Sequence, residues 1–464
     1  MSGHANGHNG VGPGKFVYPD SPLHELFHQQ VARTPDRIAV IDQERELTYT
    51  ELKRQTQTLA LSLRHRGVSE EQPVVPIFMP RCLEFAVGYI AALSAGGAYL
   101  PLEVGYPAEM LRRVLAEAKP VLTLTLESQA AKLPADAPRL CLDPGWEEAC
   151  ALLPAELAAL PSLATSLESL AYCVYSSGTT GEPKGISCPH RGSVLSYSHR
   201  AHHAPYAADG SDREACNVFF VWEMLRPLLQ GATLVVVPDS VIYDPPALSS
   251  FLERHAVTRM LFTPSLLEAV LDSPALASGD ELRRAFAAFR VVVLCGEVAT
   301  AELRARVLSL APAGLKLLNL YSISECHDVS MVDLAATPPP EGKYCSTGPL
   351  LDGVEVLILE DANQADKSGE AQRGADAAKA LRPVPLGLPG EVFVSGPCLA
   401  RGYLQRPDLT AKKFLPRPPS LSATPAPQTP GQDAASPALY SRLYDTGDWG
   451  RLRPDGTLEI FIDS

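Results

Sequence analysis

Short apolar runs alternate with helical stretches along most of the chain, and this alternation limits the possible folds more than any other feature. The runs typical of buried strands are Val74–Phe78, Val121–Thr125, Ala171–Tyr175, Thr233–Val237, Arg259–Phe262, Val291–Cys295 and Lys316–Tyr321. Helical spacing of apolar residues is found between them, at Glu84–Leu93, Ala108–Glu117, Gly192–His199 and Ala301–Ala311. This pattern predicts an α/β fold with mostly parallel sheets, whose ligands bind beyond the carboxyl ends of the strands.

The pattern changes after Gly348 to short strands with little helix, at Val354–Leu359, Gly390–Val394 and Leu458–Phe461. We therefore expect an α/β core of two sheet subdomains over residues 19–348 and a smaller β-rich subdomain over 349–464. Two segments of biased composition, 361–381 and 416–437, are expected to be loop insertions. The Gly-, His- and Asn-rich residues 1–18 are expected to form a disordered tail.

Charge and hydropathy exclude two classes of partner. The formal net charge of −13 argues against general nucleic-acid binding, which needs a basic face. The stretch Leu83–Leu102 approaches the roughly 20 apolar residues that span a bilayer. However, Gly96-Gly97 interrupts it, so a buried helix, a turn and a short strand fit better than a membrane span.

Cysteine and histidine spacing gives no sign of a metal site. The 10 Cys are scattered without a C-x-x-C pair, and the N-terminus lacks a secretory signal, so we expect reduced thiols in the cytoplasm. His199, His202 and His203 form an H-x-x-H-H group. Because no Cys or carboxylate lies at ligand spacing from them, a helix end or loop is the better interpretation.

The segment Tyr175-Ser-Ser-Gly-Thr-Thr-Gly-Glu-Pro-Lys-Gly185 has the composition of a phosphate-binding loop. Glycine lets the backbone approach a ligand, successive backbone N–H groups and hydroxyls can surround an anion, and Lys184 adds a positive charge. Composition alone also suits a flexible surface loop. A Walker A loop is excluded, because that motif needs Gly directly before the Lys and a helix directly after it.

At this segment the sequence resembles the phosphate-binding signature of adenylate-forming enzymes, which include acyl-CoA synthetases, luciferases and the adenylation domains of nonribosomal peptide synthetases. Further motifs of that superfamily follow in order from about residue 20 to the C-terminus. They are Thr48-Tyr-Thr-Glu-Leu52, Leu93-Ser-Ala-Gly-Gly-Ala-Tyr-Leu-Pro-Leu102, Asn319-Leu-Tyr-Ser-Ile-Ser-Glu325, Gly387-x-x-Gly-Glu391, Gly402-Tyr403 and Tyr444-Asp-Thr-Gly-Asp448. The second of them favours the peptide synthetase branch. The resemblance implies the large N-terminal subdomains of the adenylate-forming fold.

The resemblance also implies roles for individual residues in binding ATP and Mg2+. The pyrophosphate would be held by Ser176, Ser177, Gly178, Thr179, Thr180, Gly181 and Lys184. Tyr321 would stack on the adenine beside Gly296 and Glu297, and Asp448 would accept from the ribose hydroxyls. Ser324, where the superfamily more often has Thr, would contact the α-phosphate. Glu325 would hold Mg2+, a hard cation that prefers carboxylate oxygen.

The acid-binding pocket can be placed from the same resemblance. Its positions would be Val218, Phe219, Trp222, Ser265, Val293, Cys295, Leu320, Asp328 and Val329. Amino-acid-activating domains carry an Asp at the position of Val218, where it pairs with the substrate's α-ammonium. A buried ammonium that faces valine would lose this partner, so an ordinary α-amino acid is disfavoured.

Two aromatic side chains and one carboxylate could form a cage for a cation placed away from the α-carbon, because aromatic faces attract quaternary ammonium groups. They are Phe219, Trp222 and Asp328. Together the segments 219–228 and 321–328 are similar to the adenylation domain of carboxylic acid reductases that act on glycine betaine. Alternatively, the two aromatic residues belong to the core and Asp328 is solvated. A β- or ω-amino acid, or a small aryl or aliphatic acid, also remains open.

The C-terminus departs from the pattern of the superfamily. After the ribose motif the superfamily continues with Gly-Arg, an Asp hinge and a lid of about a hundred residues, a common domain size. Here Leu458-Glu-Ile-Phe-Ile-Asp-Ser464 omits Gly-Arg and ends, with Asp463 as the candidate hinge. We therefore expect ATP binding, and weak or no pyrophosphate exchange until a lid is supplied.

The function expected from the sequence is ATP-dependent adenylation of a carboxylic acid, with release of pyrophosphate and transfer of the acyl group to the phosphopantetheine thiol of a carrier domain. The alternatives are an acyl-CoA synthetase and a lid-less, inactive nucleotide-binding module. Neither nucleic acid nor membrane is expected as a partner.

Overall fold

The computed structural model describes residues 18–151, 163–177, 183–217, 220–360, 381–421 and 437–461 of the 464-residue chain. The expected tail 1–18 and the expected insertions 361–381 and 416–437 lie largely outside these ranges. Within the ranges, no helix is both long and apolar enough to cross a membrane. The apolar stretch 83–102 instead forms helix α3 (Leu83–Ser94), a turn with Gly96 at a φ of 77°, and strand β4 (Ala98–Leu102).

One α/β sheet has eight strands, and its inner strands are parallel. From edge to edge they are β14 (His327–Asp333), β13 (Lys316–Ile323), β12 (Val291–Leu294), β11 (Arg259–Phe262), β9 (Arg213–Cys216), β10 (Thr233–Val236), β1 (Ile38–Asp42) and β2 (Arg45–Thr48). Only the edge strands β14 and β2 pair in the antiparallel direction. We call this sheet A.

The second α/β sheet, sheet B, has seven strands. They are β18 (Gly402–Tyr403), β8 (Pro183–Pro189), β7 (Leu170–Ser177), β4, β3 (Val74–Phe78), β5 (Thr123–Thr125) and β6 (Arg139–Cys141). Strands β7 to β6 are parallel, whereas β8 forms an antiparallel hairpin with β7 and also pairs with β18. The mostly parallel sheets predicted from the alternating pattern are confirmed.

The two sheets enclose a shared layer of helices, as the alternation of side chains in single strands shows. Val291 and Val293 of β12 join the core cluster between the sheets, while Val292 and Leu294 face the opposite side. Successive residues of a strand point to opposite faces, so a strand that is apolar throughout must be covered on both faces. The central layer is made of α1 (Leu23–Arg33), α2 (Tyr49–His65), α3 and α8 (His190–His203).

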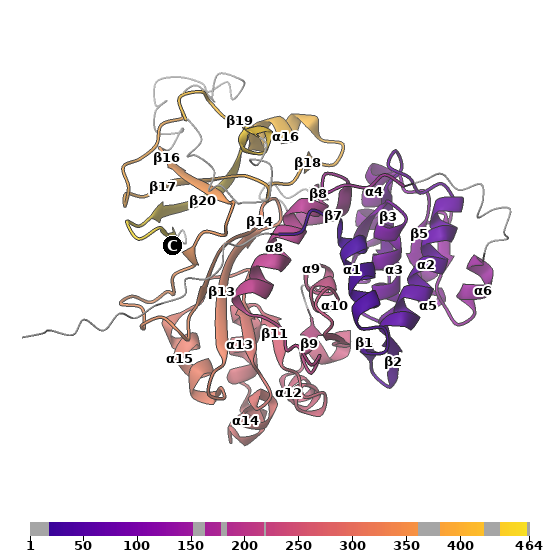
Figure 1. The fold of residues 1–464 in the computed structure, drawn as a ribbon, viewed down its shortest axis with the longest axis horizontal. Coiled ribbons are helices and arrows are strands. Elements are labelled where there is room, and N and C mark those ends of the chain that lie inside the picture. The colour runs from indigo at the N-terminus through magenta and orange to yellow at the C-terminus, as the bar shows by residue number, and fades with distance from the viewer. Residues whose placement is uncertain are drawn as a thin grey trace, which may run out of the picture.

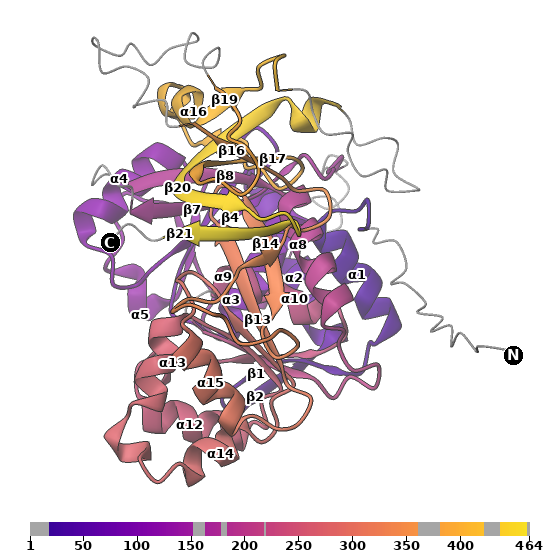
Figure 2. The same ribbon diagram turned by 90° about the vertical axis from the view of Figure 1, so that its left-hand side faces the viewer.

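Helices also cover the outer face of each sheet. Over sheet A lie α12 (Pro245–Arg254), α13 (Pro264–Leu271), α14 (Asp280–Phe286) and α15 (Ala301–Leu310), which occupy the lower part of Figures 1 and 2. Over sheet B, α4 (Ala108–Ala118) buries Leu111 and Val114 against Val74 and Phe78 of β3. Shorter helices complete these layers: α5 (Glu127–Ala130), α6 (Trp146–Cys150), α9 (Phe220–Glu223), α10 (Leu225–Leu228) and α11 (Asp239–Ile242).

A third, antiparallel sheet contains the C-terminal strands, as the change of pattern after Gly348 predicts. Its order is β15 (Gly348–Pro349), β21 (Thr457–Phe461), β20 (Arg442–Leu452), β17 (Gly390–Ser395) and β16 (Glu355–Leu359), with β19 (Phe414–Pro416) paired to β20. Helix α16 (Pro407–Lys413) lies beside it at the top of Figure 1. This sheet packs over the end of sheet A where β13 and β14 form a hairpin.

Local capping explains why several helices begin where they do. Thr48 begins α2 with a capping box: its hydroxyl accepts from the Glu51 backbone N–H at 3.2 Å, and the Glu51 carboxylate accepts from the Thr48 backbone N–H at 2.8 Å. The side chains of Asp244, Thr263 and Thr300 each accept from a backbone N–H in the first turn of α12, α13 and α15. Each such cap stabilises its helix by about 1 kcal/mol.

Candidate active site

The expected phosphate loop connects β7 and β8 of sheet B. The hairpin pairs Ser176 with Lys184 and Ser177 with Pro183, so both ends of the loop are fixed by the sheet. Its tip, with the expected ligands Gly178, Thr179, Thr180 and Gly181, lies outside the described residues. The sheet therefore presents Ser176 and Lys184 at the edge where the parallel strand β7 ends.

Lys184 and Glu325 meet at the ring of Tyr403. The Lys184 Nζ lies 5.7 Å from the centre of the Tyr403 ring, and the Tyr403 hydroxyl donates to Glu325 Oε1 at 2.8 Å. Both charged side chains are buried. Tyr403 reaches this position because β18 pairs with β8, which places it opposite Ile186. Lys184 and Glu325, which are 141 positions apart in the sequence, thus both contact Tyr403 and bring opposite charges to one polar site.

Glu325 is suited to Mg2+ only in partnership with a ligand. It lies in the tight turn of the β13–β14 hairpin, with its backbone oxygen accepting from the Ala400 N–H at 2.8 Å. Among the described residues, no cluster of three or more His, Cys, Asp or Glu could hold a metal ion. Mg2+ is commonly held by one or two carboxylates together with substrate phosphates. A single buried carboxylate beside a lysine fits that mode and does not fit an all-protein metal cage.

A cavity of about 510 Å³ lies between the β12–β13 end of sheet A and the antiparallel sheet, and we call it the nucleotide pocket. Its lining is Gly296, Glu297, Val298, Asn319, Leu320, Tyr321, Ser322, Ile323, Cys345, Thr347, Gly447, Asp448, Trp449, Ile460 and Phe461. The residues expected at the adenine and ribose, namely Gly296, Glu297, Tyr321 and Asp448, are all among them. Three separate motifs thus converge on one cavity.

Tyr321 and Asp448 are joined across the nucleotide pocket. The Tyr321 hydroxyl donates to Asp448 Oδ2 at 2.5 Å. Burial raises the pKa of Asp448 above its usual value, and the hydrogen bond from Tyr321 acts in the opposite direction. The pKa of Tyr321 is raised, first by burial and then by the neighbouring Asp448 charge. The ribose partner expected from the sequence is therefore already a hydrogen-bond acceptor on one of its oxygens.

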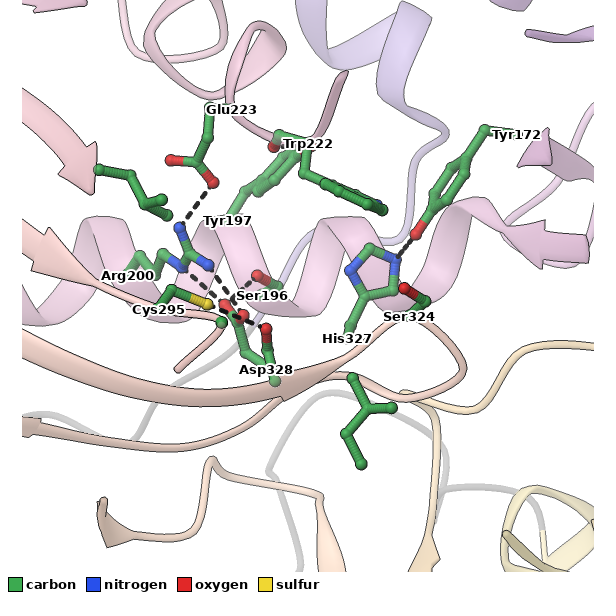
Figure 3. Close-up of a pocket in the computed structure, with 14 residues that line it drawn as sticks. Tyr172, Ser196, Tyr197, Arg200, Trp222, Glu223, Cys295, Ser324, His327 and Asp328 are labelled. Atoms are coloured by element: carbon green, nitrogen blue, oxygen red, sulfur yellow. Dashed lines mark hydrogen bonds and ion pairs between the residues drawn. The ribbon is translucent and has the colours of Figure 1, made fainter. Parts of the chain in front are cut away.

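A second cavity, of about 320 Å³, adjoins the nucleotide pocket, and we call it the acid pocket. The two share Gly296, Ser322 and Ile323. The rest of its lining is Tyr172, Ser196, Tyr197, Arg200, Trp222, Glu223, Leu261, Cys295, Ser324, His327 and Asp328 (Figure 3). A short ligand here would lie beside Ser324, next to the cavity that contains Tyr321.

Asp328 does not offer a free carboxylate to this pocket, because Arg200 of α8 binds both of its oxygens. The Arg200 Nε and Nη2 donate to Asp328 at 2.6 and 2.8 Å, and Nη1 donates to Glu223 at 3.0 Å (Figure 3). The Ser196 hydroxyl also donates to Asp328. Burial alone would raise the pKa of Asp328, but the Arg200 charge and these hydrogen bonds lower it to about 2.

The same charges continue away from the pocket as a buried ion-pair chain. Glu223 also pairs with Arg226, and Arg226 pairs with Glu214. Arg259 Nε then lies 3.6 Å from Glu214. The chain ends at Asp212, 3.8 Å from Arg259 and 3.1 Å from the half-exposed Arg290.

Each buried ion in such a chain needs its oppositely charged neighbours, because their attraction offsets the free-energy cost of removing the ion from water. The ion-pair chain consists of Asp328, Arg200, Glu223, Arg226, Glu214, Arg259 and Asp212. It links the wall of the acid pocket to strands β9 and β11 inside sheet A.

The residues assigned to the acid pocket from the sequence divide into several groups. Trp222, Cys295 and Asp328 line it. Leu320 lines the nucleotide pocket instead, and Val293 and Val329 are buried in the core without lining either cavity. Ser265 begins α13, where its N–H and hydroxyl donate to Glu297 at 2.9 and 2.8 Å. Val218 and Phe219 lie outside the described residues.

Sequence reasoning did not place Arg200, Glu223, Tyr172 or Tyr197 in the pocket. One usable signal was helical spacing, since Arg200 lies four residues after Ser196 and three after Tyr197 on α8, the separations that bring side chains to one face of a helix. His199, His202 and His203 lie in the last turns of α8, as the helix-end interpretation predicts. Burial lowers the pKa of His199 to about 3, so its imidazole is uncharged near pH 7.

The site thus combines a buried lysine and a buried carboxylate with two adjoining cavities. The chain belongs to the AMP-binding enzyme family, whose model matches residues 27–404.

Known proteins resemble the chain over nearly its whole length. It is 38% identical to glycine betaine reductase ATRR of Emericella nidulans over 438 residues, which are 94% of this chain and 31% of that protein. It is 33% identical to tyrocidine synthase 3 of Brevibacillus parabrevis over 452 residues, 95% of this chain and 6% of that protein. The chain thus spans less than a third of the length of either relative.

Solved structures agree on the fold. The nonribosomal peptide synthetase FmoA3 matches with a TM-score of 0.77 and 28% identity, over 96% of this chain and 43% of that one. VinN matches with a TM-score of 0.74 and 24% identity, over 96% of this chain and all of that one. The α/β class predicted from the sequence is therefore confirmed.

Proposed function

We propose that the protein activates a small carboxylic acid without a free α-amino group, of the glycine betaine type, as its acyl-AMP. ATP and the acid are the substrates, and pyrophosphate and the acyl-AMP are the products. A carrier domain with a phosphopantetheine thiol is the proposed acceptor of the acyl group. The observation that carries this proposal is the shared wall of Gly296, Ser322 and Ile323, which makes the nucleotide pocket and the acid pocket neighbours.

The reaction brings an acid anion to the α-phosphate of ATP, and the two repel each other. Lys184 would hold the phosphates by its charge, with the backbone of the β7–β8 loop around them. Glu325 would hold Mg2+, which supplies charge neutralisation at the phosphates when bound. The Ser324 hydroxyl, which has no hydrogen-bond partner among the described residues, is free to donate to the α-phosphate. Tyr321 and Asp448 would orient the adenosine.

Three observations support an acid of the betaine type. The position that pairs with an α-ammonium in amino-acid-activating domains is Val218, which has no charge to offer. The acid pocket presents the aromatic side chains of Tyr172, Tyr197 and Trp222, whose faces favour a quaternary ammonium group. A relative that is 38% identical over 94% of this chain carries the name glycine betaine reductase.

Acid-dependent exchange of labelled pyrophosphate into ATP tests the proposal. We expect slow exchange that requires glycine betaine, is not supported by glycine, and is lost in Lys184→Ala. Lys132→Ala, which removes an exposed lysine whose Nζ donates to the Val104 backbone oxygen, is the matched control and should behave as the wild type. Equal exchange with glycine would refute the choice of acid. Exchange that survives Lys184→Ala would refute the assignment of the phosphate site.

A further inference from the structure

His327 lines the acid pocket with one ring nitrogen engaged and the other facing the cavity. The Tyr172 hydroxyl lies 2.5 Å from His327 Nε2, and the Ser193 hydroxyl lies 3.2 Å from the same atom. Nδ1 has no hydrogen-bond partner among the described residues, and Figure 3 shows it turned toward the space between Trp222 and Ser196. The imidazole therefore presents one unused polar atom to a ligand.

The proton on this ring can be placed from the hydrogen bonds behind it. A side-chain hydrogen bond from Trp222 reaches the Tyr172 hydroxyl, and an indole N–H can only donate. The Tyr172 oxygen can accept this bond, and its own hydrogen then has two acceptors within reach, the Cys188 sulfur and His327 Nε2. The imidazole nitrogen is much the stronger acceptor and lies 2.5 Å away, so we assign the hydrogen to Nε2. An Nε2 that accepts a hydrogen bond carries no proton, so the neutral ring has its hydrogen on Nδ1, the atom that faces the pocket.

The backbone at His327 is also unusual. Its φ is 55°, in the left-handed region that a non-glycine residue adopts at a cost in free energy. The ring packs so closely on α8 that a Cβ on Gly192 would lie 2.6 Å from His327 Cδ2. The fold thus holds the ring in one orientation at the expense of local strain. Strain of this kind concentrates at ligand-binding positions.

Most other donors around the acid pocket are already used. Arg200 directs all three guanidinium nitrogens to Asp328 and Glu223, and Ser196 also donates to Asp328. The Tyr197 hydroxyl donates to a backbone oxygen at 2.5 Å. The remaining hydroxyl and thiol at the shared wall, those of Ser322 and Cys295, bond each other at 3.1 Å.

The donors left among the described side chains that line the pocket are the Ser324 hydroxyl, assigned above to the α-phosphate, the one hydrogen of the Ser322–Cys295 pair that their mutual bond does not use, and His327 Nδ1–H. We propose that His327 Nδ1–H donates a hydrogen bond to a carboxylate oxygen of the acid and so fixes which oxygen faces the α-phosphate. The inference rests on the proposed function. A neutral donor suits an acid that carries a quaternary ammonium group, because it holds the carboxylate without adding a positive charge beside the ammonium.

Two substitutions separate the donor from the backbone requirement, because both residues accept the left-handed conformation. His327→Asn keeps an N–H near the position of Nδ1, whereas His327→Gly removes it. We expect glycine betaine, titrated in the presence of AMP, to bind His327→Asn within about threefold of the wild type. His327→Gly should bind it roughly 10- to 100-fold more weakly, the usual range for losing a hydrogen bond to a charged group.

AMP titrated alone should bind the wild type and both variants equally, which shows that the fold is intact. His65→Asn, an exposed histidine at the end of α2, is the matched control and should change neither affinity. Equal loss of glycine betaine binding in His327→Asn and His327→Gly would overturn the inference, since the restored N–H would then have no effect.

Nitrogen-15 NMR of histidine-labelled protein gives a readout that does not depend on the acid. The signal that disappears in His327→Asn should show a protonated Nδ1 and a bare Nε2. A protonated Nε2 would overturn the inference even if glycine betaine binds. Conversely, a wild type that binds AMP but no glycine betaine, with Nδ1 protonated, would refute the proposed acid and leave the donor assignment in place.

Discussion

The nucleotide pocket and the acid pocket share a wall but are built in different ways. The nucleotide pocket is lined by short motifs that follow one another in the sequence, and the side chains of Tyr321 and Asp448 are joined across it by a hydrogen bond. The acid pocket is closed by a buried ion-pair chain whose members come from α8, β9, β11, β14 and the segment of α9 and α10. The cavity proposed for the nucleotide is therefore lined by recognisable short motifs, whereas the cavity proposed for the acid depends on charges that come together only in the fold.

The largest effect is expected when the ion-pair chain is cut at Arg200. Arg200→Met leaves Asp328 and Glu223 buried without their shared cation, which should lower the free energy of unfolding by about 3–5 kcal/mol. Denaturant unfolding measures this. The matched control is Arg284→Met, which removes an exposed pair with Glu253 at 3.0 Å and should cost about 0.5 kcal/mol or less. Similar losses of unfolding free energy in the two variants would show that the ion-pair chain does not stabilise the acid pocket.

The next effect concerns Lys184, the residue proposed to hold the phosphates. Lys184→Ala should weaken ATP binding roughly 10- to 100-fold, because a charge-assisted contact to phosphate is lost. AMP binding should stay within about twofold, since AMP lacks the β- and γ-phosphates. Calorimetric titration of both nucleotides checks the prediction, with Lys132→Ala as the control. Equal weakening of AMP and ATP would place Lys184 at the α-phosphate or outside the site.

A smaller effect distinguishes the two pockets by pH. Burial raises the pKa of Asp448, so this carboxylate takes up a proton at a higher pH than an ordinary aspartate. If the ionised carboxylate of Asp448 accepts hydrogen bonds from the ribose hydroxyls, protonating it should weaken AMP binding. The affinity for AMP should then fall as the pH is lowered through the raised pKa, by at most about tenfold per pH unit. Asp448→Asn should bind AMP weakly with no such pH dependence.

Asp328 provides the contrast in the acid pocket. Because Arg200 and its hydrogen bonds lower the pKa of Asp328 to about 2, this carboxylate stays ionised over the range in which Asp448 titrates. Titration of Asp328 should therefore contribute nothing to the pH dependence of AMP binding. An Asp448→Asn variant that keeps the wild-type pH profile would contradict the assignment.

The smallest effect is expected at Ser265, which the sequence places in the acid pocket and the structure places at the start of α13. Ser265→Ala removes the hydroxyl bond to Glu297 at 2.8 Å but keeps the backbone bond at 2.9 Å. We expect a loss of stability below about 1 kcal/mol and an unchanged preference between glycine betaine and glycine. Competition between the two acids in the exchange assay checks this, and an altered preference would bring Ser265 back into the pocket.

Much of the fold could be predicted because its strands are buried on both faces. The run Val74–Phe78 is apolar throughout and Arg259–Phe262 is apolar after its first residue, and the structure confirms both as β3 and β11 with the same bounds. Strand β13 was predicted to end at Tyr321 but continues to Ile323, because β14 pairs with it up to His327. The end of β13 is set by how far β14 pairs with it, and no pattern within β13 itself specifies that pairing. The two additional residues therefore could not be predicted from the sequence of β13.

Site residues could be predicted where a motif fixes both the residue and its neighbours. Gly296, Glu297, Tyr321 and Asp448 were assigned to one site from separate motifs, and the structure gathers them around one cavity. The ion pair between Arg200 and Asp328 could not be predicted, since Arg200 belongs to none of the motifs and lies 128 residues from Asp328. Charge complementarity over such a distance is decided by packing of α8 against β14, which a single sequence does not reveal.

Two adjoining pockets are proposed to bind the two parts of one acyl-adenylate. The most direct test is the affinity of a non-hydrolysable analogue in which a betaine acyl group is joined to adenosine through a sulfamate. If the pockets adjoin as described, the linked molecule should bind at least about 100-fold more tightly than AMP, and both Asp448→Asn and His327→Gly should weaken it. An analogue that binds no more tightly than AMP, in the wild type and in both variants, would contradict the account.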